Sequence, residues 1–202
     1  MTPIQEEAAR VDFPGKPKLV STLDAAVRLQ DEAAITAALR EALVALFHDP
    51  EVQLPAGVLQ PINDHYARRE LYVSPELGYS VVAMTWGPGQ GTQVHDHDHS
   101  WCVESVWQGR LAITQYEPAE RDGDRWRFDA MGTIEASPGT AGSLIPPHEY
   151  HAIRNACDAS VAVSVHVYQR PLVRCRVFVP EKPGATEGWM RREERVLATD
   201  AA

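Results

Sequence analysis

The chain has 202 residues, of which 44% are hydrophobic and 23% charged, and its formal net charge at pH 7 is −9. These values are ordinary for one globular domain with a substantial core. The negative charge argues against a nucleic-acid or anionic-membrane partner, because such partners favour basic surfaces. No run approaches the roughly 20 apolar residues of a membrane span, and the first ten residues lack the apolar core of a signal peptide. With only three cysteines, the sequence predicts a cytoplasmic protein without a disulfide framework.

The first 60 residues predict a helical segment behind a polar extension. Residues 1–20 are expected to trail over the surface. Residues 21–60 contain apolar positions at helical spacing and lack Gly and Pro until their last third. We expect one helix that begins after an N-cap at Ser21 or Thr22. A second is expected over Asp31–Phe47, whose first residue can cap it.

From residue 61 to 180 the pattern changes to short runs rich in Val, Ile, Tyr and Trp, separated by Gly and Pro turns. Strands are expected at Leu71–Val73, Tyr79–Trp86, Cys102–Trp107, Leu111–Tyr116, Trp126–Phe128, Gly142–Ile145, Ala152–Asn155, Val161–Tyr168 and Leu172–Val179. Many short strands at near-even spacing predict an all-β sandwich or barrel. Residues 181–202 are expected to form a polar C-terminal tail with one short helix. Arg191, Arg192 and Arg195 would lie on its solvated face.

Three histidines alternate along the stretch His95–His99, and His151 and His166 follow downstream. Residues two apart on a strand point to the same face, so an H-x-H pair can converge on one point. Imidazole is the commonest protein ligand for divalent first-row metals. The sequence therefore predicts a mononuclear metal site on a β scaffold. His99 is the alternative to His97 as a ligand, and His148 is the alternative to His151.

Two segments resemble the motifs of the cupin superfamily. The pattern Gly-x5-His-x-His-x4-Cys-x6-Gly begins at Gly89 and is similar to the first cupin motif, with Cys102 in place of the usual Glu. The pattern Pro-x-His-x2-His-x3-Asn begins at Pro146 and is similar to the second. The resemblance implies a cupin double-stranded β-helix, a jelly-roll-like barrel, over residues 61–180 behind the N-terminal helical segment.

A narrower resemblance is to the cysteine dioxygenase type I family in its bacterial form. It is carried by Tyr66, Arg68, His95, His97, Ser100, Cys102, His151, Ser164, His166, Tyr168 and Cys175. It implies a non-haem Fe(II) thiol dioxygenase that adds both atoms of O2 to a small carboxylated thiol, giving the sulfinic acid. L-cysteine is the leading substrate, and 3-mercaptopropionate and mercaptosuccinate are the alternatives.

The same resemblance implies a metal set and a substrate-binding set. The ligands of one Fe(II) per chain would be His95, His97 and His151. Arg68 would bind the substrate carboxylate with Tyr66 beside it, since a guanidinium recognises a carboxylate bidentately. Strand alternation lets only one of Arg68 and Arg69 face inward, and Arg170 and Arg174 are alternative carboxylate binders.

The resemblance further implies a thioether crosslink between Cys102 and Tyr168 and a hydrogen-bonded relay of Ser164, His166 and Tyr168. Two other functions stay open on the sequence alone. One is a non-catalytic cupin that holds Zn²⁺ or Ni²⁺. The other is a cupin sugar isomerase, which would more naturally keep the Glu ligand that Cys102 has displaced. The small-molecule thiol and O2 are the expected partners, and the expected state is a monomer or small homo-oligomer.

Overall fold

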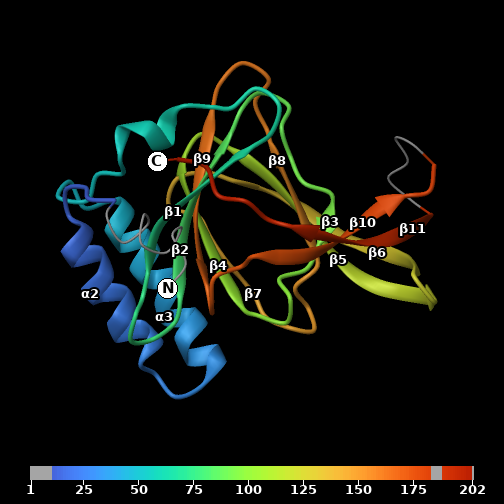
Figure 1. The fold of residues 1–202 in the computed structure, drawn as a ribbon, viewed down its shortest axis with the longest axis horizontal. Helices are drawn as coiled ribbons and strands as arrows, with labels where there is room; N and C mark the ends of the chain where they lie inside the picture. The colour runs from blue at the N-terminus through green and yellow to red at the C-terminus, as the bar shows by residue number, and fades with distance from the viewer. Residues whose placement is uncertain (1–10, 183–187, 202) are drawn as a thin grey trace.

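A computed structural model describes residues 11–182 and 188–201, in which two helices pack on one side of a β-barrel (Figure 1). The helices are α2 (Lys16–Val27) and α3 (Glu32–Phe47), followed by a 3-10 turn, η1 (Ala56–Leu59). The strands are β1 (Ala67–Val73), β2 (Ser80–Trp86), β3 (Val94–His95), β4 (Cys102–Gln108), β5 (Leu111–Asp122), β6 (Arg125–Ala136), β7 (Ala141–Leu144), β8 (His151–Asn155), β9 (Ala162–Tyr168), β10 (Arg174–Pro180) and β11 (Trp189–Val196). The predicted cupin barrel behind a helical segment is confirmed. None of the described helices is long and apolar enough to cross a membrane.

The first helix begins earlier than predicted. Its N-cap is Gly15, at a φ of 79° that favours glycine, and the helix starts at Lys16. Leu19 is fully buried in the core, so the expected surface extension is wrong for residues 16–20. Ser21 and Thr22 are not caps, because both hydroxyls donate to the Lys18 carbonyl inside the helix. Residues 1–10 of the predicted extension lie outside the described part of the chain.

The strands form two sheets that enclose the barrel interior. One is five-stranded in the order β1-β2-β9-β4-β7, and the other closes on itself as β10-β11-β6-β5-β8-β3. Strand β9 lies at the centre of the first sheet, and all seven of its residues are buried. Val163, Val165 and Val167 pack in the cluster that includes α2 and α3. The alternate residues Ser164, His166 and Tyr168 therefore face the barrel interior.

The C-terminal tail is a strand, so the predicted helix there is wrong. β11 pairs antiparallel with β10 over seven residues and with β6 over three. Backbone pairing on both sides overrides the charged composition that suggested a solvated helix. Beyond β11 the chain returns to β1, where the Asp200 N–H donates to the Arg68 carbonyl at 2.7 Å and the Arg68 N–H donates to the Asp200 carboxylate at 2.8 Å.

Candidate metal centre

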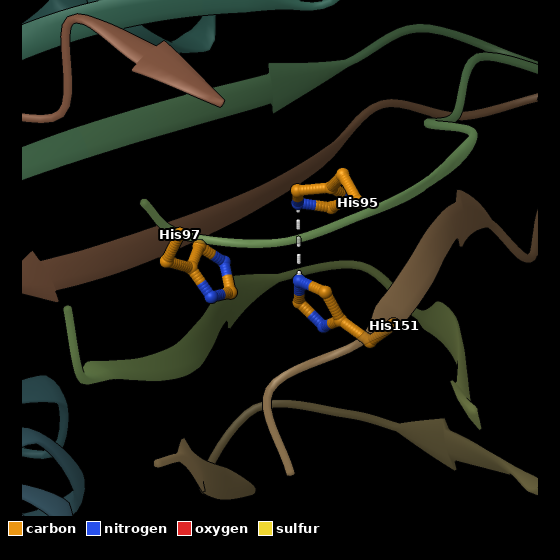
Figure 2. Close-up of side chains that lie close together, drawn as sticks. All are labelled: His95, His97 and His151. Carbon is orange, nitrogen blue, oxygen red and sulfur yellow. Dashed lines mark hydrogen bonds between the residues drawn. The ribbon is translucent and has the colours of Figure 1, made fainter. Parts of the chain in front are cut away.

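Three histidines meet inside the barrel (Figure 2). His95 closes the short strand β3, His97 follows two residues later, and His151 opens β8, where it pairs with His95 in the strand register. One ring nitrogen from each residue lies within 4.8 Å of the other two, and Nε2 of His95 is 3.2 Å from Nε2 of His151. The rings point toward one another from three different positions on the backbone. The structure thus groups the three predicted ligands.

A sharp turn separates His97 from His99. Strand β3 ends at His95, and Asp98 and His99 have φ angles of 50° and 61°, so strand alternation does not extend to His99. Asp96 supports the turn, since its Oδ1 accepts a hydrogen bond from the Arg176 N–H at 2.8 Å. His99 is exposed and contacts the Arg176 guanidinium at 3.0 Å. The turn therefore directs His99 away from the three-histidine group.

The second alternative ligand, His148, also lies outside the group. It is exposed, and its Nδ1 is 2.8 Å from a carboxylate oxygen of Glu117. It follows the Pro146-Pro147 pair in the loop that leads into β8, whereas His151 is the first residue of that strand. Strand pairing with β3 and β5 fixes the direction of His151 and leaves His148 on the surface.

Burial keeps the three imidazoles neutral. Desolvation lowers the pKa of His95, and desolvation with neighbouring imidazoles lowers the pKa of His97 and His151 well below the usual range. Neither ring nitrogen of His97 has a hydrogen-bond partner among the described residues. Two nitrogens bound to one ion at about 2.1 Å and roughly 90–110° lie about 3.0–3.4 Å apart. The donor set, its protonation and its spacing therefore fit a divalent metal ion.

A carboxyl group that the sequence analysis did not select lies beside this centre. Glu104 is two residues after Cys102 on β4, so it shares the inward face, and it is opposite His166 in the strand register. Its Oε2 is 3.2 Å from His166 Nδ1 and its Oε1 is 3.8 Å from His151 Nδ1. Oε2 lacks a well-aligned hydrogen bond. Burial raises the pKa of Glu104 to about 8.

The interior residues of β9 form only part of the expected relay. The Ser164 hydroxyl and His166 Nε2 are 2.8 Å apart, and the Trp86 indole N–H donates to Ser164 at 2.9 Å. The rings of His166 and Tyr168 stack with centroids 5.9 Å apart, and among the described residues no hydrogen bond joins them. The predicted link from His166 to Tyr168 is therefore not among the hydrogen bonds of the described residues. The two rings can stack because residues two apart on a strand share one face.

Tyr168 pairs instead with Cys102. The two residues are directly opposite in the register of β9 and β4, and the Cys102 sulfur lies 3.9 Å from Nδ1 of His166. Cys102 is a free, buried cysteine. Burial raises the pKa of Tyr168 well above its usual range, and burial does the same to the Cys102 thiol with Glu104 adding to the shift. Both groups are therefore protonated at neutral pH.

A small pocket opens beside His95 and His151, and Arg68 and Tyr66 line it. Its cavity volume is about 20 Å³. Tyr66 stacks on Trp86 with ring centroids 4.6 Å apart. Arg69 faces the opposite side of β1, where it donates to the Thr85 hydroxyl at 3.1 Å. Of the two neighbouring arginines, Arg68 is the one beside the histidines.

The alternative carboxylate binders lie elsewhere. Arg170 and Arg174 are exposed, and both approach the Asp98 carboxylate, at 3.7 and 3.5 Å. The helix expected over the tail would place a further arginine, Arg195, on its solvated face. Arg195 on β11 lines the same pocket as Arg68. A strand assignment for residues 189–196 could have drawn attention to it.

The barrel and its inward-facing histidines define a cupin fold. Solved structures with a similar fold include a protein with a double-stranded beta-helix domain from Klebsiella pneumoniae (15% identity, TM-score 0.46, covering 71% of this chain and 92% of that one). Another is an oxalate oxidase (19% identity, TM-score 0.43, covering 58% and 60%).

The chain belongs to the cysteine dioxygenase type I family, whose model matches residues 59–181. Cysteine dioxygenase type 1 of Danio rerio is 27% identical over 100 residues, which cover 50% of this chain and 49% of that protein. The Homo sapiens protein of the same name is 26% identical over 101 residues, with the same coverage. The chain thus spans about half the length of the curated relatives it matches.

The three-histidine group predicts one divalent ion per chain. Adding Fe(II) without oxygen should raise the melting temperature, because a ligand that binds only the folded state stabilises it by mass action, about 2.7 kcal/mol at a hundredfold excess over Kd. His97→Ala should abolish both the thermal shift and the one-to-one iron content. The control His99→Ala should keep both. Full iron binding by His97→Ala would contradict the assignment.

Glu104 predicts a pH-dependent stability of the metal-free protein. Its pKa is about 8 when folded and near 4.5 when exposed, so between these values the folded state holds a proton that the unfolded state has released. Stability should therefore fall as pH rises from 5 to 8. Glu104→Gln should raise the melting temperature by several degrees at pH 8 and by little at pH 5. The exposed Glu193→Gln should show no such trend, and equal shifts at both pH values would disprove the account.

Proposed function

We propose that the chain is a non-haem Fe(II) thiol dioxygenase that catalyses R–SH + O2 → R–SO2H. L-cysteine is the first candidate substrate, with 3-mercaptopropionate and mercaptosuccinate as alternatives. The proposal rests on one observation above all: three neutral imidazoles converge beside a pocket that contains the buried Arg68 guanidinium. Membership of the cysteine dioxygenase type I family supports it.

Arg68 would bind the substrate carboxylate. Its Nη1 donates to the Ala198 carbonyl at 3.1 Å and its Nη2 to the Leu172 carbonyl at 3.3 Å. A guanidinium has five N–H donors, so three remain for a ligand. No described carboxylate lies within ion-pair distance of Arg68, although only 5% of this residue is exposed. A buried cation without an anionic partner favours an anionic ligand, and Tyr66 lies beside the same space.

The three histidines would hold the iron. The bound ion would supply open coordination positions for sulfur and O2 and the redox chemistry that joins them. Because the imidazoles are neutral, they would not offset the positive charge of the ion, and the substrate thiolate would supply negative charge instead. The hydrogen bonds from Trp86 to Ser164 and between Ser164 and His166 would hold these side chains in place behind the metal centre. The protonated Tyr168 phenol lines the pocket and can donate a hydrogen bond there.

Cys102 and Tyr168 would form the thioether crosslink proposed from the family resemblance, with O2 as the oxidant that takes up the two hydrogens lost from the thiol S–H and a ring C–H. Their direct opposition across β4 and β9 supports this, as does the burial of both side chains. The mass of the intact protein, measured before and after turnover, would report the loss of two hydrogens. The cytoplasmic location and the monomer or small homo-oligomer stay predictions.

A non-catalytic cupin that holds Zn²⁺ or Ni²⁺ is the second candidate, because the three histidines alone would serve it. Oxygen consumption separates the two. Fe(II)-loaded protein should consume O2 with at least one of L-cysteine, 3-mercaptopropionate and mercaptosuccinate. One mole of the matching sulfinate should form per mole of O2, identified by mass. No uptake with iron bound would reject the dioxygenase and leave the metal-binding cupin.

Arg68 predicts a binding defect that is separate from metal binding. Arg68→Ala should raise KM for a carboxylated thiol about 10- to 100-fold, because it removes a charge-assisted hydrogen bond worth about 1.5–3 kcal/mol. Its iron content should match that of the unaltered protein. Arg174→Ala, which removes an exposed arginine on β10 that does not line the pocket, is the control and should leave KM unchanged. An unchanged KM in Arg68→Ala would remove this residue from the site.

A further inference from the structure

The pocket beside the histidines is positively charged although the chain as a whole is strongly negative. Among the described residues that line it, the only permanently charged side chains are Arg68 and Arg195, and none is Asp or Glu. The net charge of the chain is −9. One arginine is enough for one carboxylate, so the second needs its own explanation.

The strand register directs Arg195 toward the pocket. Arg195 on β11 is directly opposite Cys175 on β10, and Cys175 also lines the pocket. The Arg195 Nη2 donates to the Gln93 side-chain oxygen at 3.2 Å. The Gln93 backbone oxygen is in turn 3.0 Å from Nδ1 of His95. Arg195 is exposed whereas Arg68 is buried, so Arg195 stands at the rim and Arg68 in the interior.

Arg195 differs from its neighbours on the same strand in having no described carboxylate within ion-pair distance. Arg191 lies 3.8 Å from Glu181, and Arg192 forms an ion pair with Asp124 at 2.6 Å. The positive charge of Arg195 is thus uncompensated, like that of Arg68. Two uncompensated cations at one pocket repel each other, and a ligand with two anions offsets both.

Two pocket residues, Tyr66 and Cys175, are affected by the charges of both arginines. Burial raises the pKa of the Tyr66 hydroxyl, and the charges of Arg68 and Arg195 both oppose that shift. Burial and the Asp96 carboxylate raise the pKa of the Cys175 thiol to about 11, and the charges of Arg195 and Arg68 both oppose that shift. Tyr66 and Cys175 therefore lie within the electrostatic reach of both guanidinium groups.

We propose that Arg195 binds a second anionic group at the rim, so that the site selects a small thiol with two carboxylates over one with a single carboxylate. This rests on the proposed function and names the substrate class within it. One carboxylate would meet Arg68 inside. The other would meet Arg195, which lines the same pocket and is exposed to solvent. A monocarboxylate thiol leaves Arg195 unused.

Succinate and propionate test the binding of carboxylates without any thiol chemistry. Calorimetry on the protein at fixed iron content should show succinate binding about tenfold tighter than propionate, since one charge-assisted contact is worth about that factor. Arg195→Gln should remove this advantage and Arg195→Lys should keep part of it. Arg191→Gln changes the same charge on the same strand and should keep it all. Equal affinities in the unaltered protein, or an advantage that survives Arg195→Gln, would overturn the proposal.

Kinetics separates this proposal from the proposed function. In Arg195→Gln, kcat/KM should fall about tenfold for mercaptosuccinate, mainly through KM, and by less than about twofold for 3-mercaptopropionate. An equal fall for both thiols would refute a role in selectivity. If no thiol supports oxygen uptake while succinate binding still depends on Arg195, the dioxygenase proposal fails and the dicarboxylate site stands. If oxygen uptake occurs and Arg195→Gln affects both thiols equally, the dicarboxylate site fails and the dioxygenase proposal stands.

Discussion

Burial of strand β9 on both faces is the constraint on which the rest of the molecule depends. Its valines pack against the helices, while its alternate residues, Ser164, His166 and Tyr168, face the barrel interior. Because the side-chain period of a strand is two, a register slip of one residue would exchange the two sets. Polar groups would then enter the helix-facing core, and valines would replace the interior groups. The packing of the N-terminal helices thereby helps to hold the metal centre in register.

The same burial determines the charge of the interior. Removal from water holds the imidazoles neutral, the Tyr168 phenol protonated and the pKa of Glu104 high. The interior thus offers uncharged donors around the histidine group, and the fixed charge at the pocket comes from arginine. Such an interior suits a cation on one side and an anionic ligand on the other. The acidic residues that make the chain negative are elsewhere, many of them on its surface.

Much of the barrel was predictable, because alternation and Gly-Pro turns are local signals. The second helix was also predictable, since Asp31 caps it as expected by accepting from the Ala34 N–H. The start of the first helix was missed, because Gly15 caps it without a side-chain signal and the helix-facing core buries Leu19. The tail strand was missed because only pairing with β10 and β6 makes it a strand.

The metal group followed from spacing and resemblance, yet its immediate surroundings did not. The turn that excludes His99 depends on Asp96 and Arg176, which are 80 residues apart in sequence. Glu104 could have been found from its place on the face of Cys102. Arg195 could be found only with the tail assigned as a strand, and that assignment depends on long-range pairing with β10 and β6. The spacing of the histidines predicted the ligands, whereas contacts between residues far apart in sequence determine what surrounds them.

The segment after β11 also affects how the molecule meets other molecules. Strand β1 is an edge of the five-stranded sheet, and an edge presents unpaired N–H and C=O groups that can pair with another chain. Asp200 covers part of that edge by bonding both the N–H and the carbonyl of Arg68. Loss of this cover would expose a template for intermolecular strand pairing at the residue that faces the pocket. Aggregation and loss of ligand binding would then begin at the same place.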